Sequence, residues 1–340
     1  MAAAAALAAP AVAGAQASNP RYDPPTVQLG WSGDMAFGRD YGLPPGGPES
    51  VLTAVRSRLE GTELMAGNLE GTLGSGGPSK CGGGAANCFA FQAPASYARG
   101  YRRSGFDVVN LANNHTNDFG SYGMEQTLAA LDHAHLPHAG RPGGIKVIRS
   151  EHRIRVAYVG FAPYDWAADL RDIDGAQDLV REAAARADVV VVMMHAGAEG
   201  SGATHVPHGA EYAFGEYRGE TRRFARAVVK AGADLVVGSG PHVLRGIECY
   251  RDRVIAYSLG NFAGYHTFAT GGVLTHSGIL RVELDRDGSL VSGRLLPVRF
   301  GYPGTPRPGG GSVSFVRRLS REDFGDRACR ISHHGYLKLP

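Results

Sequence analysis

The sequence is short of three features, and each shortage argues against a class of protein. Beyond the N-terminal segment, no stretch of the 340 residues approaches the ~20 continuous apolar residues of a transmembrane segment. The 35 Lys and Arg nearly balance the 32 Asp and Glu, and a net charge of +3 argues against a dedicated nucleic-acid-binding protein. The Gly-rich phosphate loop and the Gly-x-Ser-x-Gly motif are also missing, which argues against P-loop nucleotide hydrolases and α/β-hydrolases.

Cysteine is scarce as well, and none of it forms a Cys-x-x-Cys metal-binding pair. Cys81 and Cys88 bracket a flexible Gly/Ala loop that a disulfide could hold, while Cys249 and Cys329 stand far apart in the chain. An even number of cysteines favours an oxidising compartment. The alternative is four unrelated thiols.

The N-terminal segment, residues 1–25, is rich in alanine. Ala15-Gln16-Ala17 has the small-x-small form of a signal-peptidase site, so we predict a secreted or cell-surface protein. The segment has no Lys or Arg before its apolar part and no lipobox cysteine. A disordered Ala/Pro tail is the alternative interpretation.

The rest of the chain shows a repeated pattern of an amphipathic helix, a short break, an Asp and a Val-rich strand. It occurs around Asp107, Asp188 and Asp234, and it predicts strands buried on both faces of a mixed α/β sheet. Residues 278–300 alternate around Asp287-Gly288, a turn signal that predicts an antiparallel hairpin. We expect one domain over 26–300, with 301–340 as an extension packed on it.

Polar side chains follow most of the predicted strands. Ligands of open α/β folds bind beyond the carboxyl ends of the strands, so these side chains are expected to converge. Carboxylates, amide oxygens and imidazoles together favour a divalent metal: Mn, Zn, Fe, Mg or Ca. The residues are Asp34, Asn68 and Glu70, Asn114 and His115, His195 and Glu199, His242, and Asn261.

The order of several short motifs resembles the CapA-type family of poly-γ-glutamate capsule biosynthesis proteins. The motifs are "GDMAFGR", "GNLEGTL", "NNHTNDFG", "HAGAEG", "GSGPHVLRGIE" and "AYSLGNF", and they cover roughly residues 26–300. The resemblance implies a calcineurin-like metallophosphatase fold of the α/β class. In that fold, two mixed β-sheets flanked by helices form a four-layer αββα sandwich.

The resemblance also implies a metal site, held by the residues that match the family's motifs: Asp34, Glu70, Asn114, His195 and His242. His115 matches the acid/base beside the asparagine ligand. The sequence departs from the family at Ser239, where many relatives have histidine, and it has no Asp-x-His after the first strand. One ion, or two weakly held ions, is therefore predicted.

Six further residues are candidates for the surroundings of this site. Asp118 either hydrogen-bonds a ring nitrogen of His115 or caps the helix predicted from Ser121. Glu199 is a catalytic candidate that orients a ligand or contacts substrate. Arg218 and Arg245 are candidates for binding substrate carboxylates, because arginine binds them bidentately. Glu216 and Asn261 complete the predicted substrate-binding set.

Three functions remain open from the sequence. In the leading hypothesis, a metal-dependent enzyme hydrolyses a peptide or γ-glutamyl polymer: activated water attacks, and His115 protonates the leaving group. In the second, a peptide epimerase removes and returns a Cα proton. In the third, a non-catalytic accessory protein binds polymer at the cell surface.

Overall fold

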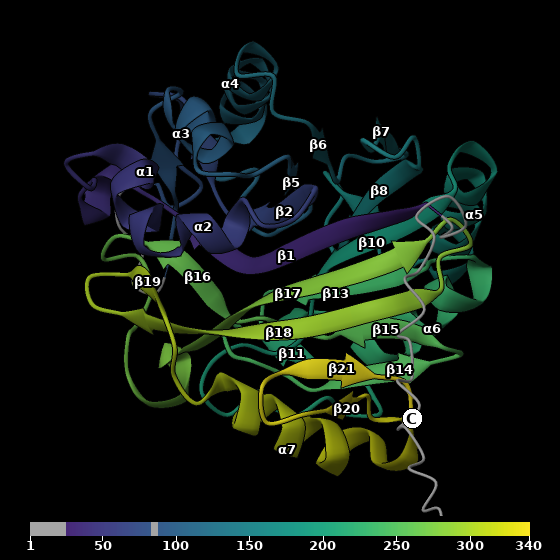
Figure 1. Cartoon of the computed structure of the whole chain (residues 1–340). Coiled ribbons are helices and arrows are strands. Elements are labelled where there is room, and N and C mark those ends of the chain that lie inside the picture. Colours follow the sequence, from purple (N-terminus) through teal and green to yellow (C-terminus); the bar gives the residue numbers. More distant parts are fainter. Residues whose placement is uncertain (1–24, 83–87) are drawn as a thin grey trace, which may run out of the picture.

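The computed structural model describes residues 25–82 and 88–340, and they form two β-sheets packed face to face (Figure 1). The predicted signal-like segment lies outside the described residues, apart from its last position. Helices cover the outer face of each sheet, so the layers run helix, sheet, sheet, helix. The predicted four-layer αββα sandwich is confirmed.

The first sheet is mixed. Its strands run in the order β20 (Arg330–Ile331), β21 (Tyr336–Lys338), β18 (Leu290–Gly301), β17 (His276–Asp285), β1 (Thr26–Ala36), β2 (Leu64–Leu69), β5 (Val108–Asn110) and β6 (His138–Ala139), with β16 (Asn261–Gly264) beside β1 and β19 (Thr305–Pro308) beside β18. The strands β1, β2, β5 and β6 are parallel, whereas β17 and β18 form the antiparallel hairpin predicted around Asp287-Gly288.

The second sheet runs β14 (Ile247–Tyr250), β15 (Arg253–Ala256), β13 (Leu235–Ser239), β10 (Val189–His195), β8 (Arg155–Ala162) and β7 (Lys146–Arg149), with β9 (Ala168–Asp169) beside β8. Its central strands are parallel, as the repeated helix–strand pattern predicts. Two short ladders complete the described strands: β3 (Thr72–Leu73) with β4 (Gln92–Ala93), and β11 (Tyr212–Ala213) with β12 (Glu216–Tyr217).

The sandwich has one apolar core between its two sheets and another on the outer face of each sheet. The core between the sheets joins Trp31 of β1 to Val191 and Val237 of the second sheet. The outer face of the first sheet is covered by α1 (Gly47–Leu52), α2 (Arg56–Leu59), α3 (Tyr97–Arg103) and α4 (Gly120–His133), and that of the second by α5 (Ile173–Arg186) and α6 (Thr221–Ala231). Among the described helices, none is long and apolar enough to cross a membrane.

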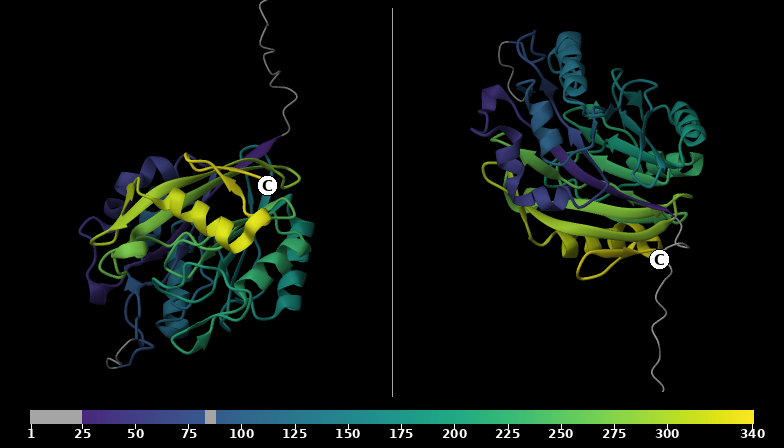
Figure 2. Two further views of the ribbon diagram at one scale, coloured as in Figure 1. Left: turned by 90° about the horizontal axis from the view of Figure 1, so that it is seen from below. Right: turned by 45° about the horizontal axis from the view of Figure 1, so that its top comes forward.

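The C-terminal segment packs on the same sandwich. The helix α7 (Ser312–Phe324) contacts β18 of the first sheet and β14 of the second, and Figure 2 shows it beneath the strands. A disulfide from Cys249 of β14 to Cys329 ties the segment down, and the predicted Cys81–Cys88 disulfide is also present. The longer bridge could not be predicted, because its two cysteines are 80 positions apart in the chain.

One close backbone approach positions the site. The peptide nitrogen of Asp34 donates to the carbonyl oxygen of Gly260 at 3.0 Å, which holds the end of β1 beside the start of β16. A Cβ atom at Gly33 would lie 1.7 Å from that oxygen. Only glycine therefore allows the two strands to meet at this level.

Candidate metal centre

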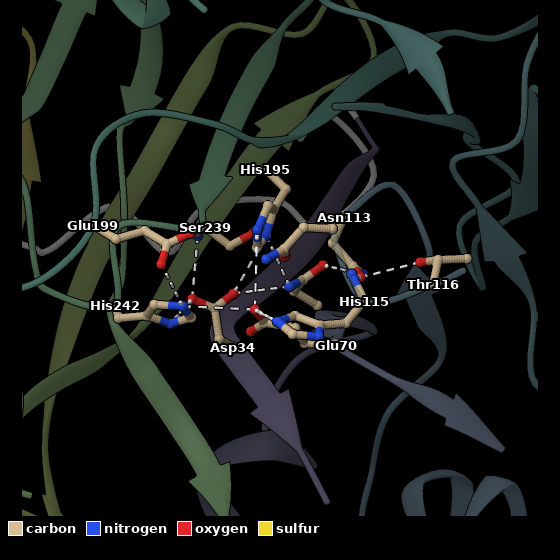
Figure 3. A network of polar contacts seen from close by, with 12 residues as sticks. Asp34, Glu70, Asn113, His115, Thr116, His195, Glu199, Ser239 and His242 are labelled. Atoms are coloured by element: carbon tan, nitrogen blue, oxygen red, sulfur yellow. Dashed lines mark hydrogen bonds and ion pairs between the residues drawn. The ribbon is translucent and has the colours of Figure 1, made fainter. Parts of the chain in front are cut away.

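A row of polar residues crosses the first sheet at one level. Asp34 pairs in register with Asn261 of β16 on one side and with Asn68 of β2 on the other, and Asn68 pairs with Asn110 of β5. On the second sheet, His195 pairs with Ser239. Because the carboxyl ends of parallel strands meet at one edge of a sheet, the two sets face each other there (Figure 3).

Three side chains at this edge are spaced as the ligands of one cation. Single ligand atoms of Asp34, Glu70 and His242 all lie within 4.8 Å of one another. Both carboxylate oxygens of Glu70 are buried without a hydrogen-bond partner among the residues that the structure describes. A buried carboxylate without a donor is costly unless a cation compensates it, so these residues fit a divalent metal ion.

The charges around His242 support the same interpretation. Burial disfavours the imidazolium, but the carboxylates of Glu70, Asp34 and Glu199 outweigh it and raise the pKa of His242 to about 10. Burial also raises the pKa of Glu70 well above its usual value. The three carboxylates thus create a strongly negative potential around His242, which a bound cation would neutralise.

The backbone of His242 is in a conformation that few side chains adopt. Its φ is +58°, and such a conformation costs about 1–3 kcal/mol for a residue other than glycine. In return, Nδ1 lies 2.9 Å from Oδ1 of Asn261 and 3.2 Å from Oδ2 of Asp34. This leaves Nε2 facing Glu70 at 3.6 Å.

His195 lies against the three ligand candidates and is fully buried. Its Nδ1 is 3.2 Å from both the Asn68 amide nitrogen and the Ser239 hydroxyl, while Nε2 has no partner among the described residues and lies 4.0 Å from Glu70. Burial lowers the pKa of His195 to about 3, so the ring is neutral. Ser239 thus contacts the ring of His195.

His115 is held by a chain of charged groups. Its Nδ1 lies 2.8 Å from Oδ2 of Asp118, which also accepts from the peptide nitrogen of Phe91 at 2.7 Å. Lys80 forms an ion pair with the other oxygen of Asp118 at 2.6 Å. Nε2 of His115 is left facing Glu70 at 3.8 Å. Burial lowers the pKa of His115 even though Asp118 opposes the shift.

These contacts decide between the two roles considered for Asp118. The helix α4 begins at Gly120 with Phe119 as N-cap, and no side chain caps it. Asp118 is therefore the partner of His115 and not a helix cap, and Ser121 is inside the helix.

The two asparagines before His115 have different surroundings. Asn113 is fully buried; it donates to Asn68 and to the carbonyl oxygen of Leu69, and its own oxygen accepts from the peptide nitrogen of His115. Oδ1 of Asn114 is buried without a partner among the described residues, and Asn114 lines the same cavity as His115 and His242. Asn113 thus shapes the turn, and Asn114 retains a free oxygen at the site.

The other candidates divide into two groups. Glu199 and Asn261 line the cavity beside His242, and Arg218 lies on its wall, ion-paired with Glu199 at 2.6 Å and with Glu216 at 3.1 Å. Arg245, by contrast, is not placed to bind substrate. Its donors are used inside the protein, on the carboxylate of Glu211 at 2.6 Å and on two backbone carbonyl oxygens.

Sequence reasoning missed several residues that surround the centre: Asn110, Asn113, Lys80, Phe91 and Glu211. Asn110 had a usable signal, since it stands at the same level of its strand as Asn68 does in the neighbouring one. Lys80 had none, because it reaches Asp118 from a loop 38 positions earlier in the chain.

The chain is similar to known proteins along most of its length. Residues 28–265 match the family model of the bacterial capsule synthesis protein PGA_cap. The capsule biosynthesis protein CapA of Bacillus anthracis is 31% identical over 61% of this chain and 51% of its own length. The PGA biosynthesis protein CapA of Bacillus subtilis is 26% identical over 79% of this chain and 70% of its own. The chain thus spans about half the length of the first relative.

A solved structure supports the fold. A phosphatase from Mycoplasma pneumoniae superposes with a TM-score of 0.50 over 82% of this chain and 95% of its own, at 11% sequence identity. At that identity the likeness concerns the fold alone.

Proposed function

Because the chain belongs to the bacterial capsule synthesis protein family PGA_cap, we propose that it is a metal-dependent enzyme that hydrolyses a peptide or γ-glutamyl polymer. One observation carries the proposal: Glu70 is buried without a donor among the described residues, beside Asp34, His242 and His195, and His242 in turn lines an open cavity. An accessory protein that only binds polymer has no need of such a costly arrangement.

Asp34, Glu70 and His242 would hold the ion, with Asn114 and His195 beside them. A divalent cation in this place supplies Lewis acidity, which polarises a carbonyl oxygen and makes water more acidic. The oxygen-rich donor set is compatible with Mn, Zn, Fe, Mg or Ca.

The residues of the chain supply the proton transfer. Asp118 accepts the Nδ1 hydrogen of His115, so that Nε2 carries the lone pair toward the cavity. His115 takes a proton from the attacking water and passes it to the leaving nitrogen as the C–N bond breaks. Glu199 keeps Arg218 on the cavity wall. Burial keeps His115 neutral and therefore able to act first as a base.

The family and the two disulfides support a location of this protein outside the cytoplasm. A capsule polymer lies outside the cell, and disulfides persist in oxidising compartments. We propose that the protein acts outside the cytoplasm, where the polymer is made or trimmed.

The test is incubation of the purified protein with Mn²⁺ and short peptides or γ-glutamyl oligomers in D₂O, followed by mass spectrometry. Hydrolysis yields two fragments, and EDTA abolishes their formation. His115→Ala is expected to lower kcat about 10²–10⁴-fold. Arg181→Ala, on the exposed face of α5, serves as a control with unchanged kcat.

Two results would replace the proposal. A gain of one dalton without cleavage would show Cα exchange and establish the epimerase. If neither product forms and Asp34→Ala leaves the metal content unchanged, the protein is not a metal-dependent enzyme, and the accessory role stands.

A further inference from the structure

The cavity beside the candidate metal centre has a volume of about 710 Å³, and six of its 20 lining residues are Phe, Tyr or Trp. Asn114, His115 and His242 form its floor. The aromatic wall consists of six side chains from four separate segments: Phe89, Phe91, Tyr164, Trp166, Phe214 and Phe268. Aromatic walls with a few polar groups at one end are typical of sites that bind an apolar group beside a reacting bond.

Part of this wall is fixed in position before any ligand arrives. Tyr164 and Trp166 stack with their ring centroids 4.8 Å apart and their planes 8° from parallel. The Trp166 indole donates to the carbonyl oxygen of Asn113 at 2.9 Å, which ties the stack to the turn before His115. The stacked pair thus stands at a fixed place relative to the proposed proton carrier.

The rim of the cavity exposes large apolar side chains to solvent. Phe214 is 74% exposed and Phe89 is 44% exposed. Phe214 occupies the turn between β11 and β12 with φ at +51°, and Gly215 follows at +81°. Such turns favour Asn or Gly at the first position, so a strained, exposed phenylalanine points to a role in binding.

The charged side chains that line the cavity do not favour the binding of a polyanion. Among the residues that the structure describes, its lining contains two side chains of the Lys or Arg type, and both already pair with carboxylates: Lys80 with Asp118, and Arg218 with Glu199 and Glu216. A chain that carries a carboxylate on every unit needs free cations, and arginines above all. It would also approach Glu216, whose side chain is 55% exposed, at the rim.

We propose that the segment which occupies this cavity during reaction is a peptide bearing an aromatic or large apolar side chain, and not a run of glutamates. The inference rests on the proposed function, since it takes the cavity to be the substrate site. It narrows that function to one of the two substrate classes that the sequence left open.

Trp166 allows a direct binding test. The chain has two tryptophans, and the other, Trp31, is 1% exposed in the core between the sheets. The full chain, treated with EDTA, is titrated with acetyl-Gly-Phe-Gly-amide and with tri-γ-glutamate, and tryptophan emission is followed at low and high salt. We expect saturable binding of the Phe peptide, at least about tenfold tighter than that of tri-γ-glutamate and insensitive to salt.

Three variants make the test specific. Trp166→Phe removes the optical signal, which assigns the emission change to this residue and not to Trp31. Phe214→Ser weakens binding of the Phe peptide about tenfold without lowering the melting temperature, because its side chain is mostly exposed. Tyr336→Ser, which removes an exposed aromatic residue on β21, leaves binding unchanged.

The inference is overturned if tri-γ-glutamate binds more tightly, if neither ligand saturates, or if Phe214→Ser has no effect. The proposed function fails by a different observation: a bound Phe-containing peptide that the Mn²⁺-loaded protein leaves chemically unchanged.

Discussion

Substitution of Glu70 by glutamine should change stability in opposite directions with and without metal. The replacement keeps the shape of the side chain and removes its charge. In the fold, both oxygens of Glu70 are buried with no donor among the described residues, and the nearest imidazole nitrogen, on His242, is 3.6 Å away. The charge therefore destabilises the metal-free protein and stabilises the loaded one.

The sizes of the two effects can be estimated. An uncompensated buried charge costs several kcal/mol, whereas a buried neutral amide costs about 1–3 kcal/mol, so Glu70→Gln should leave the metal-free protein equally or more stable. In Mn²⁺ at 100 times the dissociation constant, the natural protein gains about 2.7 kcal/mol, or roughly 4 °C in Tm. If loss of the ligand weakens binding about 100-fold, the variant gains only about 0.4 kcal/mol.

The assay is thermal unfolding of both proteins in EDTA and in Mn²⁺, with metal content measured by mass spectrometry. Glu248→Gln is the matched control, because Glu248 is equally buried but hydrogen-bonds to Arg226 and Tyr257, far from the site. That variant should lose stability in both conditions and keep the full response to Mn²⁺. The reasoning is refuted if Glu70→Gln responds to Mn²⁺ as the natural protein does.

Three more predictions follow from single contacts. Gly33→Ala should lower the free energy of unfolding by more than about 2 kcal/mol and abolish Mn²⁺ binding, because its Cβ would lie 1.7 Å from a carbonyl oxygen. Gly301→Ala, with open space around it, should do neither. Equal chemical denaturation midpoints for the two variants would contradict this. Burial raises the pKa of Asp234 from 3.8 to about 6, so the folded state binds this proton more tightly and loses stability as the pH rises from 4 to 6. The free energy of unfolding of Asp234→Asn, measured in urea, should therefore rise by about 2–3 kcal/mol relative to that of the natural protein between pH 4 and pH 7. A difference that does not change with pH would refute the assignment. Replacing Cys249 and Cys329 by serine, a pair separated by 80 positions, should cost about 4 kcal/mol of unfolding free energy, more than loss of the shorter disulfide loop; a smaller loss than for the shorter loop would contradict the chain-entropy argument.

The sequence was sufficient for the fold and for the convergence of the polar strand ends at one edge, and the reason is local. A Val-rich run that ends in a polar residue indicates both a buried strand and the polar edge that follows it, as in the run that ends at His195. The sequence could not separate Arg218 from Arg245. The two differ only in their partners, and Glu211, which holds Arg245 inside the protein, comes from 34 positions away.

The sequence also could not predict the separate roles of Asn113 and Asn114 in the turn before His115. Asn113 and Asn114 are chemically identical neighbours, and the turn decides which one points to the cavity. The oxygen of Asn113 accepts from the peptide nitrogen of His115, a local contact that consumes it. Asn114 keeps its oxygen free, so the position of one hydrogen bond separates a structural residue from a ligand candidate.

Ser239 provides the last prediction, the number of metal ions. In the structure its hydroxyl lies 3.2 Å from Nδ1 of His195, and its side chain is fully buried. Asp34, Glu70 and His242 are spaced to hold one cation, and a serine hydroxyl is a weaker metal ligand than an imidazole. We therefore expect one Mn²⁺ per chain, both in the natural protein and in Ser239→Ala. The alanine variant should nevertheless bind Mn²⁺ about 10–100-fold more weakly if His195 contacts the ion, because the ring loses a hydrogen bond that orients it. Equilibrium dialysis with Mn²⁺ measures both quantities. Two ions per natural chain, falling to one in the variant, would show that the serine hydroxyl takes part in a second site.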